Sequence, residues 1–360
     1  MASASPAIFD CDGHIIESIP EMAEFMDPVI KPLATNPSRN RMGVFPGLDG
    51  MHYPRDNEAL ADVEQETREY VVASDFRKGS GEDIAAFQDK AGIETSVLFT
   101  SEGLSVGFIQ QSDYAVRVCR AFNDYVADRY ARVSSRLRPM GLIPMSDPSA
   151  AALELRRLVK ELGLPGAMLP STGLSLHHGH EFYWPVYKEA AELGCALGIH
   201  GGSSVGFGAD SYTSAWAARA VRHPVPLLLA LTSMIYHGVL DRFPDFHIGF
   251  FEGGAAWPAV LLDRMVRDDS VYVGGGSGRA LRDYFSSGQV LIGCEGNEEI
   301  LSYLSARVGI EAFAFASDYP HEVDVVAARN MIDETLQRSD LSAEEKEAVL
   351  GGNAKRFYRL

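Results

Sequence analysis

Short apolar runs alternate with longer amphipathic stretches along most of the chain. Runs of four to six residues, many of them rich in β-branched and aromatic side chains, are typical of buried parallel strands. They predict eight strands: Ala7–Asp12, Thr95–Thr100, Arg138–Ile143, Gly166–Leu169, Ala196–His200, His247–Phe251, Gln289–Cys294 and Ala312–Ala316.

The stretches between these runs repeat their apolar residues with helical spacing. They predict the helices Ser112–Tyr130, Asp147–Leu162, Trp184–Leu193, Pro226–Phe243, Trp257–Val266, Asn297–Val308 and Asp324–Leu336. Eight strands joined by helices predict an α/β fold, the (β/α)₈ or TIM barrel. An open doubly wound sheet is the alternative, but no glycine-rich phosphate-binding motif follows the first run.

Two segments fall outside this repeat. Residues 18–90 separate the first two strands by far more than a usual connection, are rich in proline and contain a charged helical stretch at Asn57–Ser74. Because the βα loops of a barrel emerge on its catalytic face, we expect this insertion to form a lid over the mouth. Leu341–Leu360 predicts two closing helices, so we expect residues 1–360 to form one domain.

Composition narrows the class of protein. With 46% hydrophobic and 22% charged residues the chain is globular, and its apolar runs are shorter than the roughly 20 residues of a membrane span. Four cysteines without a CxxC pair indicate reduced thiols, and no leader pattern precedes the first strand, so we expect a cytoplasmic protein. The net charge of −17 would repel nucleic acid and anionic membranes. We therefore expect neither partner, a small-molecule substrate, and a homo-oligomer, in particular a dimer.

Ionisable side chains gather where the predicted strands end. Asp12 and His14 share one face of the first strand because side chains alternate with period two, and Asp10 on that face is expected to anchor backbone. Three later strand ends contribute His200, Glu252 and the pair Asp318 and His321. Each residue alone has an ordinary structural explanation, such as capping a turn. Their joint occurrence at the mouth of one barrel instead predicts a catalytic Zn²⁺, Mn²⁺ or Fe²⁺ site.

Six motifs follow one another along the chain: Asp10–Glu17, Phe182–His200, Gly238–Asp245, Glu252–Met265, Ala316–His321 and Gly352–Tyr358. In this order the chain resembles the amidohydrolase superfamily. The resemblance is to the amidohydrolase-related branch, which includes metal-dependent, non-oxidative decarboxylases of aromatic and muconate-type acids. It extends over nearly the whole chain outside the insertion.

The resemblance implies that four residues bind a divalent metal ion, Zn or Mn: Asp12, His14, His200 and Asp318. In the decarboxylase members a histidine at the end of strand six acts as acid or base, but Glu252 occupies that position here. A carboxylate can carry a proton when its pKa is raised, or it can bind the metal instead. The candidate catalytic residues are therefore Glu252, Asp318 and His321.

A second metal ion is an alternative. Binuclear hydrolases of the superfamily use a carboxylated lysine at strand four, which is absent at Met168–Ser171. Glu17 and Glu252 could supply the missing oxygens, which would give a set similar to that of non-haem di-iron sites: Asp12, His14, Glu17, His200, Glu252 and Asp318. For Glu17, a solvent-facing carboxylate at a helix start is an equally good interpretation.

Other candidate residues have weaker patterns. His177, His178 and His180 lie in the loop after strand four, and only His178 is a candidate for touching substrate. His223, His237 and His247 have no pattern, and Gly274–Gly276 lacks the strand and lysine of a phosphate loop.

Three functions remain open from the sequence. The first is a metal-dependent hydrolase or non-oxidative decarboxylase of a small carboxylic-acid substrate, which is partly hydrophobic because the insertion carries Phe25, Phe45 and Tyr53. The second is a di-iron hydroxylating monooxygenase on the same barrel. The third, a non-catalytic barrel, would leave the clustered ligands unexplained.

Overall fold

The computed structural model describes residues 6–36, 43–48, 79–271 and 278–360. Its strands are all parallel and run in chain order around the molecule, as the (β/α)₈ prediction requires. They are β1 (Ile8–Ile15), β2 (Ile93–Thr100), β3 (Leu137–Pro139), β4 (Gly141–Leu142), β5 (Gly166–Pro170), β6 (Ala196–His200), β7 (His247–Phe251), β8 (Val290–Cys294) and β9 (Phe313–Phe315).

The strands form two hydrogen-bonded sheets, β1–β3 and β4–β9, and the barrel closes where these sheets meet at two places. β3 and β4 are the two halves of the predicted third strand, interrupted at Met140, whose N–H donates to the Leu98 carbonyl at 2.8 Å. After β9, the N–H of Asp318 donates to the carbonyl of Asp12 at 2.7 Å, and the N–H of His14 donates to that of Tyr319 at 2.6 Å. The second joint therefore connects the first and last strands at their carboxyl ends.

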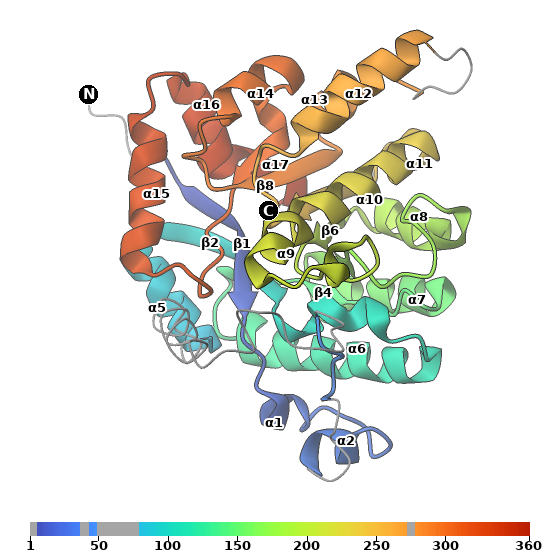
Figure 1. Ribbon diagram of the computed structural model, residues 1–360. Helices are drawn as coiled ribbons and strands as arrows, with labels where there is room; N and C mark the ends of the chain where they lie inside the picture. Colours follow the sequence, from blue (N-terminus) through green and yellow to red (C-terminus); the bar gives the residue numbers. More distant parts are fainter. Residues whose placement is uncertain (1–5, 37–42, 49–78, 272–277) are drawn as a thin grey trace.

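Helices surround the strands (Figure 1). They include α5 (Gly81–Ala91), α6 (Ser112–Val126), α7 (Pro148–Lys160), α8 (Trp184–Leu193), α9 (Ala215–Arg222), α10 (Pro224–Tyr236), α11 (Val239–Arg242), α12 (Pro258–Val271), α13 (Leu281–Ser286), α14 (Leu301–Val308) and α15 (Val325–Gln337). The chain ends with α16 (Ala343–Glu347) and α17 (Asn353–Tyr358), which are the two predicted closing helices. Among the described residues, no helix is long and apolar enough to span a bilayer.

Three local predictions need correction. The predicted helix Pro226–Phe243 is two helices, because the chain turns at Gly238 with φ +69°. The first strand continues to Ile15, which places His14 inside it. The end of the 18–90 insertion is the regular helix α5, which begins at a Ser80–Asp83 capping box and packs against β2.

The rest of that insertion is described only in part. α1 (Ile19–Met22) and α2 (Lys31–Thr35) are short helices, and the helix expected at Asn57–Ser74 lies outside the described residues.

Aromatic rings fill the barrel beneath the strand ends. Phe99 and Phe251 are fully buried with ring centroids 4.7 Å apart, and the Phe99 ring lies 5.1 Å from that of His200. A Cβ at Gly198 would meet both phenyl rings at 2.9 Å, so only glycine fits between them. This packing seals the polar cluster above it from below.

Candidate metal centre and active site

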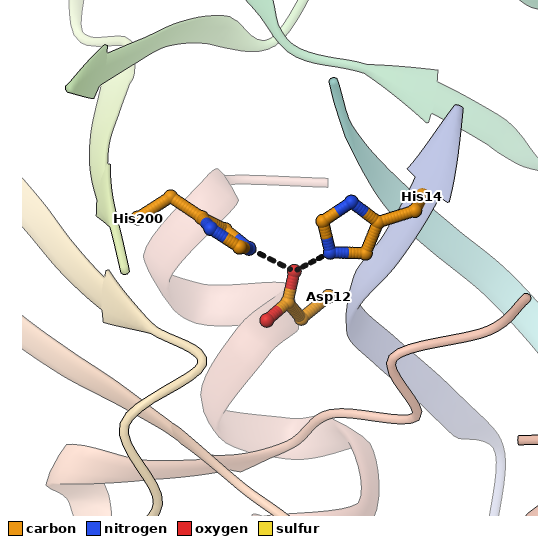
Figure 2. Close-up of side chains that lie close together, drawn as sticks. All are labelled: Asp12, His14 and His200. Carbon is orange, nitrogen blue, oxygen red and sulfur yellow. Dashed lines mark hydrogen bonds and ion pairs between the residues drawn. The ribbon is translucent and has the colours of Figure 1, made fainter. Parts of the chain in front are cut away.

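Three predicted ligands converge at the carboxyl ends of β1 and β6. The Asp12 Oδ1 atom lies 3.2 Å from Nε2 of His200 and 3.6 Å from Nε2 of His14, and each residue is at most 1% exposed. Figure 2 shows the carboxylate between the two imidazole rings. These residues can all direct a ligand atom at one ion.

The Nδ1 atoms of His200 and His14 each contact a backbone carbonyl. Nδ1 of His200 lies 2.8 Å from the Gly201 carbonyl, and Nδ1 of His14 lies 3.3 Å from the Thr100 carbonyl. A carbonyl can only accept, so each Nδ1 carries a proton, and the neutral His14 ring presents the lone pair of its Nε2 to the cluster. Burial lowers the pKa of His200, but the Asp12 carboxylate 3.2 Å from its Nε2 outweighs burial and raises this pKa to about 9. Nε2 of His14 has no hydrogen-bond partner among the described residues although it is fully buried. An orphaned buried nitrogen beside a carboxylate fits a metal ion.

Asp318, the fourth predicted ligand, lies in the segment after β9 and could hold an ion together with His14 and His321. Its Oδ1 lies 3.3 Å from Nε2 of His14 and 2.7 Å from Nδ1 of His321, and the His321 ring lies 4.0 Å from that of His14. Nε2 of His321 lies 3.0 Å from the Ser101 hydroxyl. Asp318 therefore faces the ligands on one side and a polar chain of His321 and Ser101 on the other.

The residues that carry the carboxylates after β7 and β9 have a strained backbone. Glu252 has φ +60° and Asp318 has φ +58°, a region that non-glycine residues rarely adopt. Such strain is found mainly where a functional side chain must be aimed in a fixed direction.

Glu252 contacts His200 and His223 and does not face the predicted ligand atoms. Its Oε2 lies 3.3 Å from Nδ1 of His200, the edge of the ring opposite Nε2, and its Oε1 lies 3.2 Å from Nδ1 of His223. Glu252 belongs to neither group of residues that could jointly hold an ion among the described residues. It therefore lies at the outer edge of the His200 ring, where its Oε2 has no hydrogen-bond partner among the described residues.

His223, which has no sequence pattern, is part of the site. It joins α9 to α10, Nε of Arg222 donates to its Nε2 at 2.9 Å, and its Nδ1 lies 3.2 Å from Oε1 of Glu252. No strand-end motif marks His223, and only the fold brings it beside Glu252.

Glu17 is not available as a ligand. Its buried carboxylate accepts hydrogen bonds from the hydroxyl of Thr100 and from the backbone N–H groups of Ser101, Glu102 and Gly103. Four donors occupy both oxygens, so Glu17 holds the turn after β2. Neither the ligand role nor the solvent-facing role expected from the sequence describes it.

His178 also has a structural place. It is 5% exposed, and its Nε2 donates to the Pro170 carbonyl at 2.9 Å. Burial lowers the pKa of its imidazole to about 4, so the ring is neutral. His178 is not among the described residues that line the cavities at the strand ends, which argues against substrate contact.

Asp10 anchors backbone, as expected. It accepts hydrogen bonds from the N–H of Asp12 at 3.2 Å and from the N–H and hydroxyl of Ser317 at 2.9 and 2.8 Å. These bonds connect β1 to the segment that carries Asp318.

The electrostatics of the centre favour a bound cation. Burial raises the pKa of Asp12 to about 7, and it also raises the pKa of Asp318. Burial lowers the pKa of His14 well below its usual value. A divalent ion would compensate the desolvated carboxylates and bind the neutral imidazole.

A cleft opens over the centre. It comprises a cavity of about 620 Å³ and a neighbouring one of about 450 Å³, which share five lining residues: Arg219, His223, Glu252, Asp318 and Glu322. Asp12 lies in the wall of the first cavity, and Gly43 and Phe45–Leu48 of the insertion line the second. The centre is therefore open to a small molecule.

Comparison with known proteins gives consistent matches. The sequence profile of the family described as Amidohydrolase matches residues 9–360. The 2-amino-3-carboxymuconate-6-semialdehyde decarboxylase of Dictyostelium discoideum is 28% identical over 259 residues, which cover 71% of this chain and 70% of that protein.

Two solved structures share the fold. An amidohydrolase from Mycobacterium avium subsp. paratuberculosis superposes with a TM-score of 0.73 at 17% identity, covering 99% of this chain and 98% of that one. The 5-carboxyvanillate decarboxylase of Novosphingobium aromaticivorans, complexed with manganese and a nitrobenzoic acid, gives a TM-score of 0.70 at 20% identity over 100% and 98% of the two chains.

Proposed function

Because this chain belongs to the amidohydrolase family, we propose that it is a metal-dependent, non-oxidative decarboxylase of small, partly hydrophobic carboxylic acids. One observation carries the proposal. Asp12, His14 and His200 can direct their ligand atoms at one ion beneath an open cleft, and the buried Nε2 of His14 has no hydrogen-bond partner among the described residues. Relatives named for decarboxylation of muconate-type and hydroxybenzoate-type acids support this choice over hydrolysis.

The residues that would hold the ion are Asp12, His14, His200 and Asp318. A divalent ion there, Zn or Mn, would supply a Lewis acid that binds the substrate carboxylate and stabilises negative charge on the substrate. A solved relative contains manganese, which is compatible with this mixture of oxygen and nitrogen ligands.

The protein's own part in the reaction is to orient the acid and move one proton. Loss of CO₂ breaks the bond between the carboxylate and its neighbouring carbon, and the electron pair left on that carbon must take a proton. Asp318 is suited to carry this proton because it faces the ligands and contacts His321, which reaches the Ser101 hydroxyl. Glu252, which has His223 3.2 Å from its other oxygen, places a negative charge 3.3 Å from the outer edge of the His200 ring.

The di-iron oxygenase alternative has no such support. It required Glu17 and Glu252 as additional ligands, but Glu17 is occupied by four donors and Glu252 lies on the outer edge of His200.

The proposal extends to the insertion beside the cleft and to the state of the whole protein. We propose that the insertion acts as a lid, since residues 43–48 already line the cleft. We also propose that the protein is a cytoplasmic homo-oligomer, in particular a dimer, that acts on a small molecule. Its net charge of −17 would repel nucleic acid and anionic membranes, so we propose that it binds neither.

The direct test is release of CO₂. Metal-free protein is reconstituted with Mn²⁺ or Zn²⁺ and incubated with two acids. One is 5-carboxyvanillate, and the other is 2,6-dihydroxybenzoate, the acid of a solved 2,6-dihydroxybenzoate decarboxylase that shares the fold. We expect metal-dependent CO₂ release and, in D₂O, one deuterium in the product at the carbon that lost the carboxylate. Metal-dependent hydrolysis of esters or amides without CO₂ release from any aromatic acid would refute the proposal.

A further inference from the structure

The loop between β5 and α8 carries three histidines, and they do not all face the same way. His178 is buried, whereas His177 is exposed. The centroid of the His177 ring lies 4.2 Å from that of His237, an exposed residue at the end of α10. Two imidazole rings from separate elements therefore meet at the surface. Neither is among the described residues that line the cleft.

The backbone of this loop is held against the last turn of α10. The N–H of Gly179 donates to the Ser233 hydroxyl at 3.0 Å, and the indole N–H of Trp184 donates to the Gly179 carbonyl at 3.2 Å. A Cβ at Gly179 would clash with the Ser233 carbonyl, so only glycine permits this close approach. The position of His177 relative to His237 is therefore set by the fold.

The orientation of the His237 ring suits a metal ligand. Its Nδ1 lies 2.8 Å from the Ser233 carbonyl, which can only accept, so the neutral ring carries its proton there and has a lone pair on Nε2. Metal-bound histidines usually donate their other nitrogen to a carbonyl in this way. His237 is also the C-cap of α10, and the carbonyls at a helix C-terminus favour a positive charge.

The two other rings of this cluster differ in what they can offer. Burial and the neighbouring rings of His237 and His180 lower the pKa of His177, so its imidazole is neutral near neutral pH. His180 lies farther off, with its ring centroid 5.7 Å from that of His177. Its Nδ1 accepts the N–H of Phe182 at 3.1 Å, so the lone pair of neutral His180 is already used. Two imidazoles are therefore available to an ion.

We propose that His177 and His237 bind a late first-row divalent ion, Zn²⁺, Ni²⁺ or Cu²⁺, at a surface site separate from the metal centre. Imidazole ligands favour these ions over Mn²⁺. Water takes the remaining coordination positions because both rings are exposed. The ion joins the loop after β5 to the end of α10.

This site and the metal centre differ in affinity. Two exposed imidazoles hold an ion less tightly than four converging ligands do, so gel filtration into metal-free buffer empties the surface site and leaves the ion of the centre. Protein loaded with Mn²⁺ carries metal at the centre alone, because Mn²⁺ is the weakest of these ions for imidazole sites. The two sites can therefore be measured separately.

Titration calorimetry on the Zn²⁺-loaded full chain tests the inference. After removal of excess metal the centre holds its ion, and further Zn²⁺ is then added. We expect one additional Zn²⁺ per chain. His177→Gln and His237→Gln should each weaken this second event by more than about tenfold, since losing a ligand costs more than losing its outer-sphere partner.

His180→Gln is the matched control, because it removes an imidazole from the same loop without removing a proposed ligand. It should leave the second event within about threefold of the wild type. Thermal unfolding without added Zn²⁺ checks that all three variants fold. In excess Zn²⁺ the midpoint should rise in the wild type and in His180→Gln but not in the other two variants.

Several results would overturn the inference. These are no additional Zn²⁺ in the wild type, an unchanged second event in folded His177→Gln or His237→Gln, and a loss in His180→Gln as large as in those two variants. The inference does not depend on the proposed function. The rate of CO₂ release by Zn²⁺-loaded protein should stay within about twofold in all three variants, so failure of one proposal leaves the other standing.

Discussion

Two walls of the same cleft differ in how their charged side chains are held. The wall formed by Asp12, His14 and Asp318 is part of the barrel joint, where backbone bonds of 2.6 and 2.7 Å connect the first and last strands. A second wall holds Arg219, on a helix outside the expected barrel repeat, and His223, which follows that helix, and their side chains are 33% and 14% exposed. The first wall is therefore fixed by the closure of the barrel, and the second depends on how one additional helix packs.

The largest effect is expected from removing a ligand. His200→Ala should lower metal affinity by more than about 100-fold and abolish turnover, because the loss of a ligand exceeds the loss of an outer-sphere contact. Elemental analysis and thermal unfolding check this result, with the exposed His237→Ala as the matched control. Full metal content in folded His200→Ala would remove His200 from the centre.

The next largest effect concerns the proton. Asp318→Asn keeps an oxygen ligand but cannot donate a proton as an acid, so the rate of CO₂ release should fall by about 100-fold or more. Rates are compared at saturating Mn²⁺, with exposed Asp333→Asn as the control. A rate within twofold of the wild type would place the proton donor elsewhere.

A smaller effect is expected from the residues behind His200. Glu252→Gln removes a charge behind His200 without removing a ligand, so the rate should fall by about 10- to 100-fold, the range seen for outer-sphere partners of metal ligands. His223→Gln should show a smaller loss in the same direction, since it acts through Glu252. An effect of His223→Gln in a Glu252→Gln background as large as in the wild type would show that the two act independently.

The smallest effect on the centre is expected from Glu17. Glu17→Gln places an amide NH₂ against backbone donors and should lower the free energy of unfolding by about 2–4 kcal/mol without changing metal content. Urea unfolding and elemental analysis check both parts, with exposed Glu344→Gln as the control. Metal loss without destabilisation would restore Glu17 as a ligand.

The difference between the walls also explains what the sequence could predict. Period-two alternation in β1 and polar residues at strand ends predict that Asp12, His14, His200 and Asp318 lie close together, because a closed barrel brings all strand ends together. The eight strands followed from their apolar runs in the same way. These features depend on the repeat itself.

Residues outside the repeat were harder to predict. The donors to Glu17 come from Thr100 to Gly103, more than 80 positions away, so neither local charge nor helix position reveals them. His178 is neutralised by burial that a loop sequence does not predict. His223 and Arg219 depend on where α9 packs, which no hydrophobic period in the sequence specifies.

The central claim is a single metal ion held by Asp12, His14, His200 and Asp318, with Glu252 outside its coordination sphere. Elemental analysis of the wild type and Glu252→Gln, each saturated with metal and freed of excess, tests it most directly. The account predicts one divalent ion per chain in both proteins. Two ions in the wild type that fall to one in Glu252→Gln would contradict it.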